Sequence, residues 1–509
     1  MTSEATGVRM RDVAAERLAP ACAELAGAGA RLLTFFGADE RDTASELAIY
    51  AVFLQPDRGT LALRAGIDPR ESSYPAVTPV LPAVHWDERE IQDLLGIHPE
   101  GHPDPRRLVL REDWPADSFP LRKDFDSSRV PPAPRELESF TPRPVEGEGV
   151  VSIPVGPIHA GIIEPGHFRF AAVGDTVLHL EAQLFYTHRG IEKLAEGRTP
   201  EQALPLAERI CGACACSNAV AFCQAIEARA GVEIPARARW ARTLLLELER
   251  LYNHLGDAGN MCAGVGFAVG NMQGALLKER LQQLNERLVG HRFLRGTCAV
   301  GGLRRDLADA ELPAVRGELA RIHADMRAFT RLLVETDAFT DRIRGTGRLD
   351  AEAVRTFGGV GVAARASGVD TDLRRDRPHA AYADLHTLHV PIHTTGDAEA
   401  RLRQRLAEAV VSFHLVDELL ERPPTGPFHV AVSHPRDSRC LGIGATESPR
   451  GANVHAVLLD AEGRITRYRV RSASFPNWPL VPLTAPGNLL PDFPLINKSF
   501  ELCYSCLDR

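Results

Sequence analysis

Two pairs of cysteines, each with the spacing CxxC, restrict the possible folds of this chain more than any other feature. The first pair is Cys211 and Cys214, and the second is Cys503 and Cys506. Two cysteines three positions apart can direct both sulfur atoms at one point, and two such pairs can supply four thiolates to one site. Structural zinc ribbons usually separate their pairs by about 15–20 residues. Here almost a whole domain separates them, so a shared site would join the beginning of that domain to its end.

The donor chemistry leaves several metals open. Soft thiolates favour nickel, iron, zinc or copper(I) over magnesium or calcium. Thiols must lose their protons to bind, and the metal offsets the resulting negative charge. The long separation is unusual for structural zinc and suits a buried catalytic metal, but spacing alone also allows zinc or unrelated cysteines. The scattered Cys22, Cys262, Cys298 and Cys440 are interpreted as small buried apolar residues.

Length and composition indicate a soluble globular protein. A chain of 509 residues predicts two or three domains. Its contents of 44% hydrophobic and 25% charged residues are ordinary for a globular protein, and its net charge of −8 argues against a nucleic-acid binder. No apolar stretch reaches the roughly 18–20 residues that span a bilayer, and the N-terminus has no signal-peptide pattern. We therefore expect a cytoplasmic protein that partners hold at a membrane.

Hydrophobic periodicity predicts a small α/β domain over residues 1–128. Residues 14–36 are predicted as an amphipathic helix, 46–54 and 60–67 as strands, and a further helix begins near Trp86. Residues 129–150 are rich in proline, glycine and charge and have no periodicity, which predicts a linker between domains.

Residues 151–509 are predicted to form a second, mainly helical domain with peripheral strands, so the expected fold class is α+β. Strand-like alternation follows Val151, and from about 200 to 340 the helical period of apolar residues indicates a bundle. Residues 350–400 show no clear pattern, and 401–422 are predicted as a helix. Two strands joined by a turn are expected within 451–472.

A series of motifs in this second domain resembles the large subunit of formate hydrogenlyase-type, complex-I-related group 4 [NiFe] hydrogenases. That fold is similar to the 49-kilodalton subunit of complex I. The motifs are, in order, PVGPIHAGIIEPGHFRF, LFYTHRGIEKLAE, ERICGACACSNA, RTLLLELERLYNHL, GGLRRDL, ESPRG and CYSCLDR. The resemblance implies that Cys211 and Cys503 are terminal nickel ligands and that Cys214 and Cys506 bridge nickel to iron. The iron would carry cyanide and carbon monoxide, in a NiFe(CN)2CO centre.

The same resemblance implies catalytic roles for two further residues. Arg450 in ESPRG resembles an arginine that lies above the metals, where its guanidinium places a fixed positive charge. Glu164 in IIEPGHF resembles a glutamate that passes protons to and from a nickel thiolate. Without the resemblance, the two would be interpreted as an ordinary ion pair and a surface carboxylate.

Other polar residues of the motifs have a structural interpretation. Glu247, Arg250 and His254 lie at spacings of three and four on one predicted helix, and we interpret them as a polar cluster inside the bundle. His159 resembles a quinone-facing position of the complex I relative. In a hydrogenase the resemblance favours a structural or proton-path role for it.

The implied reaction is 2H⁺ + 2e⁻ ⇌ H₂ in a membrane-associated complex. The chain has no obvious second four-cysteine motif, so the resemblance places a [4Fe–4S] cluster in a small iron–sulfur partner similar to the 20-kilodalton subunit of complex I. Complex-I-like membrane subunits would hold the chain on the inner face of the cell membrane, with formate dehydrogenase or a ferredoxin-type protein as electron donor. The alternative is a complex I (NADH-quinone oxidoreductase)-like C/D fusion subunit with a degenerate metal site. A structural zinc protein is the third interpretation.

Residues 86–125 resemble the signature of the 30-kilodalton subunit of complex I, a part that such hydrogenase large subunits carry as a fusion. Their sequence is WDEREIQDLLGIHPEGHPDPRRLVLREDWPADSFPLRKDF, and nothing in it indicates chemistry. Its charged side chains are predicted to dock partners or to form internal ion pairs: Asp104, Arg106, Arg107, Arg122 and Lys123.

Four features near the cysteines depart from the family pattern. Asn218 stands where the family often has a histidine, Glu501 and Leu502 stand in place of Asp-Pro before the second pair, and Cys216 adds a thiol. The family also makes a C-terminal extension that a protease removes after metal insertion, whereas this sequence stops at Arg509. All four thiols are present, so the metal site stays the prediction.

Overall fold

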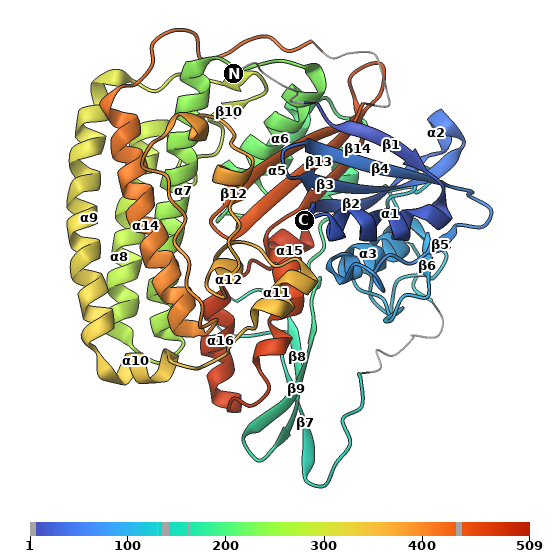
Figure 1. Cartoon of the computed structure of the whole chain (residues 1–509), viewed down its shortest axis with the longest axis horizontal. Coiled ribbons are helices and arrows are strands. Elements are labelled where there is room, and N and C mark those ends of the chain that lie inside the picture. The colour runs from blue at the N-terminus through green and yellow to red at the C-terminus, as the bar shows by residue number, and fades with distance from the viewer. Residues whose placement is uncertain (1–6, 130, 135–141, 161–162, 434–439) are drawn as a thin grey trace.

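The computed structural model describes residues 7–129, 131–134, 142–160, 163–433 and 440–509. Figure 1 shows a long helical bundle on one side, a mixed N-terminal part on the other, and a sheet from the C-terminal part between them. The fold class is α+β, as predicted.

The N-terminal part (residues 7–129) is built on a four-stranded sheet of order β1-β4-β3-β2. The outer strand β1 runs parallel to β4, and the other pairs are antiparallel. One face packs on helices α1 and α3, and the small strands β5 and β6 lie beyond them. The elements are β1 (Arg9–Val13), α1 (Ala15–Gly27), β2 (Arg31–Glu40), α2 (Arg41–Ala44), β3 (Glu46–Gln55), β4 (Gly59–Ile67), β5 (Ser73–Pro75), α3 (His85–Leu95) and β6 (His98–Glu100). The two predicted strands and the helix near Trp86 are confirmed.

The predicted helix over residues 14–36 is wrong in its second half. Helix α1 ends at Gly27, and Gly29 has a φ of 82°, a conformation that L side chains rarely adopt. The chain then enters β2, whose middle residues are buried. A strand that is buried on both faces forms a continuous apolar run, which periodicity alone does not distinguish from a helix.

A second sheet lies against the first. Strands β12 (Gly442–Ser448), β13 (Gly451–Leu459) and β14 (Ile465–Arg471) are antiparallel in that order. Their side chains pack on the face of the N-terminal sheet that α1 and α3 leave free, and the shared core includes Phe36, Tyr50, Ile443 and Val454. The hairpin expected within 451–472 is confirmed, whereas β12 was not predicted.

Four long helices form the predicted bundle: α7 (Ala236–Ala263), α8 (Ala268–Val289), α9 (Leu312–Glu335) and α14 (Ala398–Glu421). Helices α4 (Ile191–Ala195), α5 (Pro200–Glu208) and α6 (Ala215–Ala230) precede it, and α6 packs on β12. The strands β10 (Cys298–Ala299) and β11 (Gly302–Leu303) and the short helix α10 (Asp337–Ile343) connect the long helices. Residues 350–400 form only short helices, namely α11 (Ala351–Phe357), α12 (Gly361–Arg365) and α13 (Leu373–Asp376).

A third sheet projects from the body of the molecule (Figure 1). It consists of β7 (Val150–Val155), β8 (His167–Val173) and β9 (Thr176–Gln183). The described residues of the predicted linker before β7 form no helix or strand, and the domain boundary there stays a prediction. The C-terminal helices are α15 (Ser474–Asn477), α16 (Phe493–Phe500) and α17 (Ser505–Asp508). Within the described ranges, no helix is long and apolar enough to cross a membrane.

Candidate metal centre

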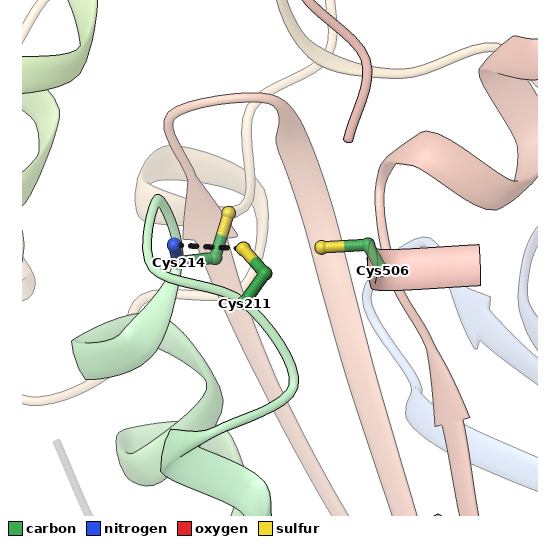
Figure 2. A group of neighbouring side chains, drawn as sticks. All are labelled: Cys211, Cys214 and Cys506. Carbon is green, nitrogen blue, oxygen red and sulfur yellow. Dashed lines mark hydrogen bonds between the residues drawn. The ribbon is translucent and has the colours of Figure 1, made fainter. Parts of the chain in front are cut away.

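The fold brings the two CxxC pairs together. The sulfur atoms of Cys211, Cys214 and Cys506 lie within 4.8 Å of one another, and all three residues are buried. Figure 2 shows the first two on a loop before α6 and the third approaching from the C-terminal segment. The thiol of Cys503 contacts those of Cys211 and Cys506. All four predicted ligands therefore meet in one group, which we call the thiol cluster.

Side chains of α7 hold the loop of the first pair. The Tyr252 hydroxyl donates to the carbonyl of Gly212 at 3.0 Å, and the Asn253 amide donates to the carbonyl of Ala213 at 2.7 Å. These bonds occupy the backbone carbonyls between the two cysteines. The loop is thus fixed by a rigid helix, which favours a precise arrangement of its sulfur atoms.

The same helix also anchors the residues after the loop. The Glu249 carboxylate accepts hydrogen bonds from the backbone N–H groups of Cys216 and Ser217, at 2.6 and 2.9 Å. These groups belong to the first turn of α6, where a carboxylate is electrostatically favoured. Burial nevertheless raises the pKa of Glu249 to about 7.

The second pair is fixed by the segment that follows β14. The Ser474 hydroxyl accepts a hydrogen bond from the N–H of Cys503 at 3.0 Å. The Ser472 hydroxyl donates to the carbonyl of Cys506 at 3.2 Å. Glu501, which stands before the pair, adopts φ of 51° and accepts from the Asn260 amide at 2.6 Å. Both ends of the pair are therefore tied to other elements.

The thiols oppose one another's ionisation. Contacts with Cys211 and Cys506 lower the pKa of Cys214 to about 6. Contact with Cys211 raises the pKa of Cys503 to about 12, and the pKa of Cys506 is raised well above its ordinary value by its three thiol neighbours. Four adjacent thiolates would repel one another, and a bound divalent cation removes this conflict. The donor set therefore fits a soft metal ion.

Arg450 lies beside the thiol cluster. Its guanidinium forms two contacts with the Asp257 carboxylate, at 2.7 and 3.0 Å, and the residue is buried. Burial alone would lower the pKa of Arg450, but Asp257 and then Cys214 outweigh burial and hold the pKa above its ordinary value. The positive charge of Arg450 in turn helps to lower the pKa of Cys214. The arginine thus stays charged at the cluster.

Glu164 contacts the second cysteine pair. Its Oε2 accepts a hydrogen bond from the backbone N–H of Ser505 at 2.9 Å, and its Oε1 accepts from the Ser505 hydroxyl. Ser505 lies between Cys503 and Cys506 in the sequence. Glu164 is only partly buried. The carboxylate therefore lies between the cysteine pair and the more open side of the protein.

The polar cluster predicted inside the bundle is confirmed. Glu247 accepts hydrogen bonds from the hydroxyls of Tyr382 and Ser412, both at 2.5 Å, and contacts Arg250. His254 binds Glu408 on α14 at 3.0 Å. Glu247 and His254 are both fully buried, and burial lowers the pKa of His254 to about 4. Arg250 donates to the carbonyls of Glu447 and Ser448, so the cluster also fixes the turn that leads to Arg450.

Two departures from the family pattern lead away from the thiol cluster. Asn218 is fully buried, and its Oδ1 lies 3.0 Å from the Asn453 amide and 3.2 Å from Nε2 of His455. The thiol of Cys216 contacts that of Cys298 and is not part of the compact group of three sulfur atoms. Cys22, Cys262 and Cys298 are buried as predicted, whereas Cys440 is only partly buried.

Charged side chains of the N-terminal signature make contacts within the chain. Arg106 pairs with Asp104 at 2.8 Å and with Glu181 of β9 at 2.6 Å. Lys123 pairs with Glu196 at 3.1 Å. Backbone carbonyls accept from the other two, namely those of Arg111 and Trp114 from Arg107 and that of Leu95 from Arg122. Of the two predicted alternatives, the structure supports internal contacts. His159 likewise binds within its own loop, at 2.7 Å from the carbonyl of Gly166.

The fold and the thiol cluster together define the class that includes nickel-dependent hydrogenases and the matching subunits of complex I. Family models agree over most of the chain. The 30 Kd subunit of respiratory-chain NADH dehydrogenase matches residues 11–130, and nickel-dependent hydrogenase matches residues 189–256. The 49 Kd subunit of respiratory-chain NADH dehydrogenase matches residues 265–440 and 441–509.

Individual relatives narrow this class. Formate hydrogenlyase subunit 5 of Escherichia coli (strain K12) is 36% identical over 94% of this chain and 85% of its own length. Hydrogenase-4 component G of the same organism is 35% identical over 94% and 84%. The C/D subunit of NADH-quinone oxidoreductase from Phocaeicola vulgatus is 30% identical over 70% and 71%. The chain belongs to the complex-I-related family of [NiFe] hydrogenase large subunits with a fused N-terminal part of the complex I type, and it is an oxidoreductase. Because these relatives are subunits or components, it acts in a multi-subunit assembly.

Proposed function

We propose that this chain is the catalytic subunit of a membrane-associated [NiFe] hydrogenase and that Cys211, Cys214, Cys503 and Cys506 hold a NiFe(CN)2CO centre. The observation that carries the proposal is the meeting of two distant CxxC pairs in one buried thiol cluster. When bound, the centre supplies the redox chemistry that interconverts protons, electrons and H₂.

Arg450 supplies a fixed positive charge at the thiols. Its two contacts with Asp257 determine how the guanidinium plane is oriented. A charge that is already oriented by the protein needs no rearrangement during the reaction. Arg450 therefore stabilises negative charge at the cysteine sulfur atoms.

Glu164 moves protons between the second cysteine pair and the more open side of the protein. Its carboxylate contacts Ser505, which lies between Cys503 and Cys506, and it is only partly buried. A general acid or base must lie within hydrogen-bonding reach of the group that it serves, directly or through one further group. The Ser505 hydroxyl is the group that contacts Glu164 here.

Electrons leave through partners. Among the described residues, no second group of three or more metal-ligating side chains is present. The proposal therefore places the [4Fe–4S] cluster in a small iron–sulfur protein similar to the 20-kilodalton subunit of complex I. Membrane subunits similar to those of complex I hold the chain on the cytoplasmic face, and formate dehydrogenase or a ferredoxin-type protein donates electrons.

A second candidate is supported by the relative from Phocaeicola vulgatus, which is named a quinone oxidoreductase subunit. In that case the chain would transfer electrons or bind quinone, and the metal site would be degenerate. Four thiols that are retained and in contact argue against a degenerate site. Structural zinc would use the same thiols but would leave the positions of Arg450 and Glu164 unexplained.

Elemental analysis decides among these candidates. The chain, purified from its native host under low oxygen, should contain about one nickel and one iron, with infrared bands of carbon monoxide and cyanide. Cys506→Ser should lose the metals and hydrogen turnover. Cys22→Ser, which changes a buried thiol of α1, should keep both and serves as the matched control. Zinc alone, or no metal after co-expression of maturation proteins, would overturn the proposal.

A further inference from the structure

The signature helix α3 of the N-terminal part reaches the C-terminal segment that carries the second cysteine pair. Glu90 on α3 forms an ion pair with Arg509, which also pairs with Glu192 of α4 at 2.9 Å. Glu90 is 3% exposed and Arg509 is 1% exposed. Both charges are therefore removed from water and depend on each other.

Arginines of β14 complete this buried ionic group. Arg469 pairs with Asp87 of α3 at 2.7 Å and also with Glu90. Arg467 pairs with Glu192 at 2.7 Å. The group thus joins four parts of the fold, namely α3, α4, β14 and the C-terminal segment.

An aromatic contact connects the same parts. The guanidinium carbons of Arg469 and Arg509 each lie 5.1 Å from the ring centre of Phe475. Trp86 of α3 packs on that ring edge-on, with ring centres 5.8 Å apart. Phe475 follows Ser474, whose hydroxyl binds the N–H of Cys503. Helix α3 therefore contacts both ends of the segment that presents the thiols.

The C-terminal segment has little internal means of keeping its position. Helix α17 has four residues, far fewer than a helix needs to be stable by itself. Cys506 lies on this helix, and Arg509 follows it after one turn. Tertiary contacts must hold the helix, and the Arg509 ion pairs are the contacts beyond its last turn.

We propose that Glu90 is a positioning residue for the metal site: through Arg509 it holds Cys506 in the thiol cluster. The N-terminal signature then has a task within this chain, because the cluster is complete only while α3 is docked. The inference rests on the proposed function in so far as the cluster is the metal site, but the position of the thiol can be tested separately.

The test compares the exposure of Cys506 in four full-length proteins: wild type, Glu90→Gln, Arg509→Gln and the double variant. Each is treated anaerobically with N-ethylmaleimide, and mass spectrometry follows the labelling of the peptide that contains Cys503 and Cys506. Glu90→Gln should speed the labelling of Cys506 at least about tenfold, because the loss of one partner of a buried pair favours local opening. Nickel content, measured in parallel, should fall in the same variants.

The matched control is Glu88→Gln on the same helix. Glu88 is equally buried, but its carboxylate binds Tyr74, Val77 and Thr78 within the N-terminal part. If Glu88→Gln speeds labelling as much as Glu90→Gln, general loosening explains the effect and the inference is overturned. Wild-type labelling in Arg509→Gln overturns it as well, even if Glu90→Gln does not fold.

The double variant separates a shared contact from two independent effects. If Glu90 acts through Arg509, the double variant should label no faster than the faster single variant. Multiplied effects would contradict the inference. A wild-type protein without nickel would refute the proposed function, whereas the comparison of labelling rates would still decide the role of Glu90.

Discussion

Arg450 and Asp257 form a paired contact in which each guanidinium nitrogen meets its own carboxylate oxygen. The distances are 2.7 Å from Nη1 to Oδ2 and 3.0 Å from Nη2 to Oδ1. Asp257 lies on the rigid helix α7, whereas Arg450 lies on the turn between β12 and β13. A planar guanidinium can match both oxygens at once, and an ammonium group cannot. The direction of the charge at the thiols therefore depends on the shape of this side chain.

Replacing Arg450 by lysine keeps the charge and removes the paired geometry. We expect Arg450→Lys to lower hydrogen turnover about 100-fold or more, the scale seen when one oriented donor is lost from an active site. Nickel content should not change, because the four thiols remain. Hydrogen evolution with a reduced viologen dye measures the effect. Arg403→Lys, which keeps a surface pair with Glu399, should behave as wild type. Equal activity of the two variants would refute the role of Arg450.

Proton transfer through Glu164 predicts a selective loss of isotope exchange. Glu164→Gln should lower the exchange of D₂ with water protons about 100-fold or more, because an amide cannot take up and release a proton at this pH. The metals should remain bound. The control is Glu148→Gln, which changes an exposed carboxylate ahead of β7. Exchange at the wild-type rate in Glu164→Gln would show that protons use another route.

Glu247 predicts a dependence of stability on pH. Burial would raise its pKa, but Arg250 and Arg374 outweigh burial and lower the pKa from 4.5 to about 2. A carboxyl group with a lowered pKa stabilises the fold above pH 4.5, and this contribution is lost as the pH falls from 4.5 towards 2.

Glu247→Gln should therefore lower the free energy of unfolding by about 3–5 kcal/mol at pH 7, and the difference from wild type should shrink below pH 4.5. Urea unfolding at pH 7 and at pH 3.5 measures it. Glu335→Gln, at the exposed end of α9, should have little effect at either pH. A difference that is equal at both pH values would contradict the assignment of the charge to Glu247.

Asn218 predicts that the more common histidine does not fit this chain. Its Oδ1 lies within hydrogen-bonding distance of Asn453 and His455, and the residue is fully buried. Asn218→His should lower the free energy of unfolding by about 1–3 kcal/mol, because buried partners lose an acceptor. Thermal unfolding measures the change. An unchanged or increased melting temperature would show that the pocket accepts the ring.

Most long elements could be predicted from periodicity, and β12 shows why others could not. All seven residues of GIGATES are buried, so the strand lacks alternation. A Cβ atom at Gly444 would lie 1.8 Å from the carbonyl oxygen of Ala221 in α6. The strand therefore requires small residues for close packing on a helix, and small residues give no apolar signal.

The candidate site shows a similar division. The four cysteines are conspicuous in the sequence because of their type and spacing. Asp257 and Glu408 are not conspicuous, although they bind Arg450 and His254. Each partner lies more than 150 positions away, and on a helix a buried carboxylate has the same spacing pattern as one that faces water. Only the folded chain shows which acidic residues face inward.

The wide separation of the two cysteine pairs also sets an order of events during synthesis. At ribosomal rates of about 5–20 residues per second, Cys503 is made roughly 15–60 s after Cys214. For that time Cys211 and Cys214 have no sulfur partners from the second pair. The newly made bundle can already hold their loop through Tyr252 and Asn253. Half of the cluster is thus arranged early, and it waits for the other half to emerge from the ribosome.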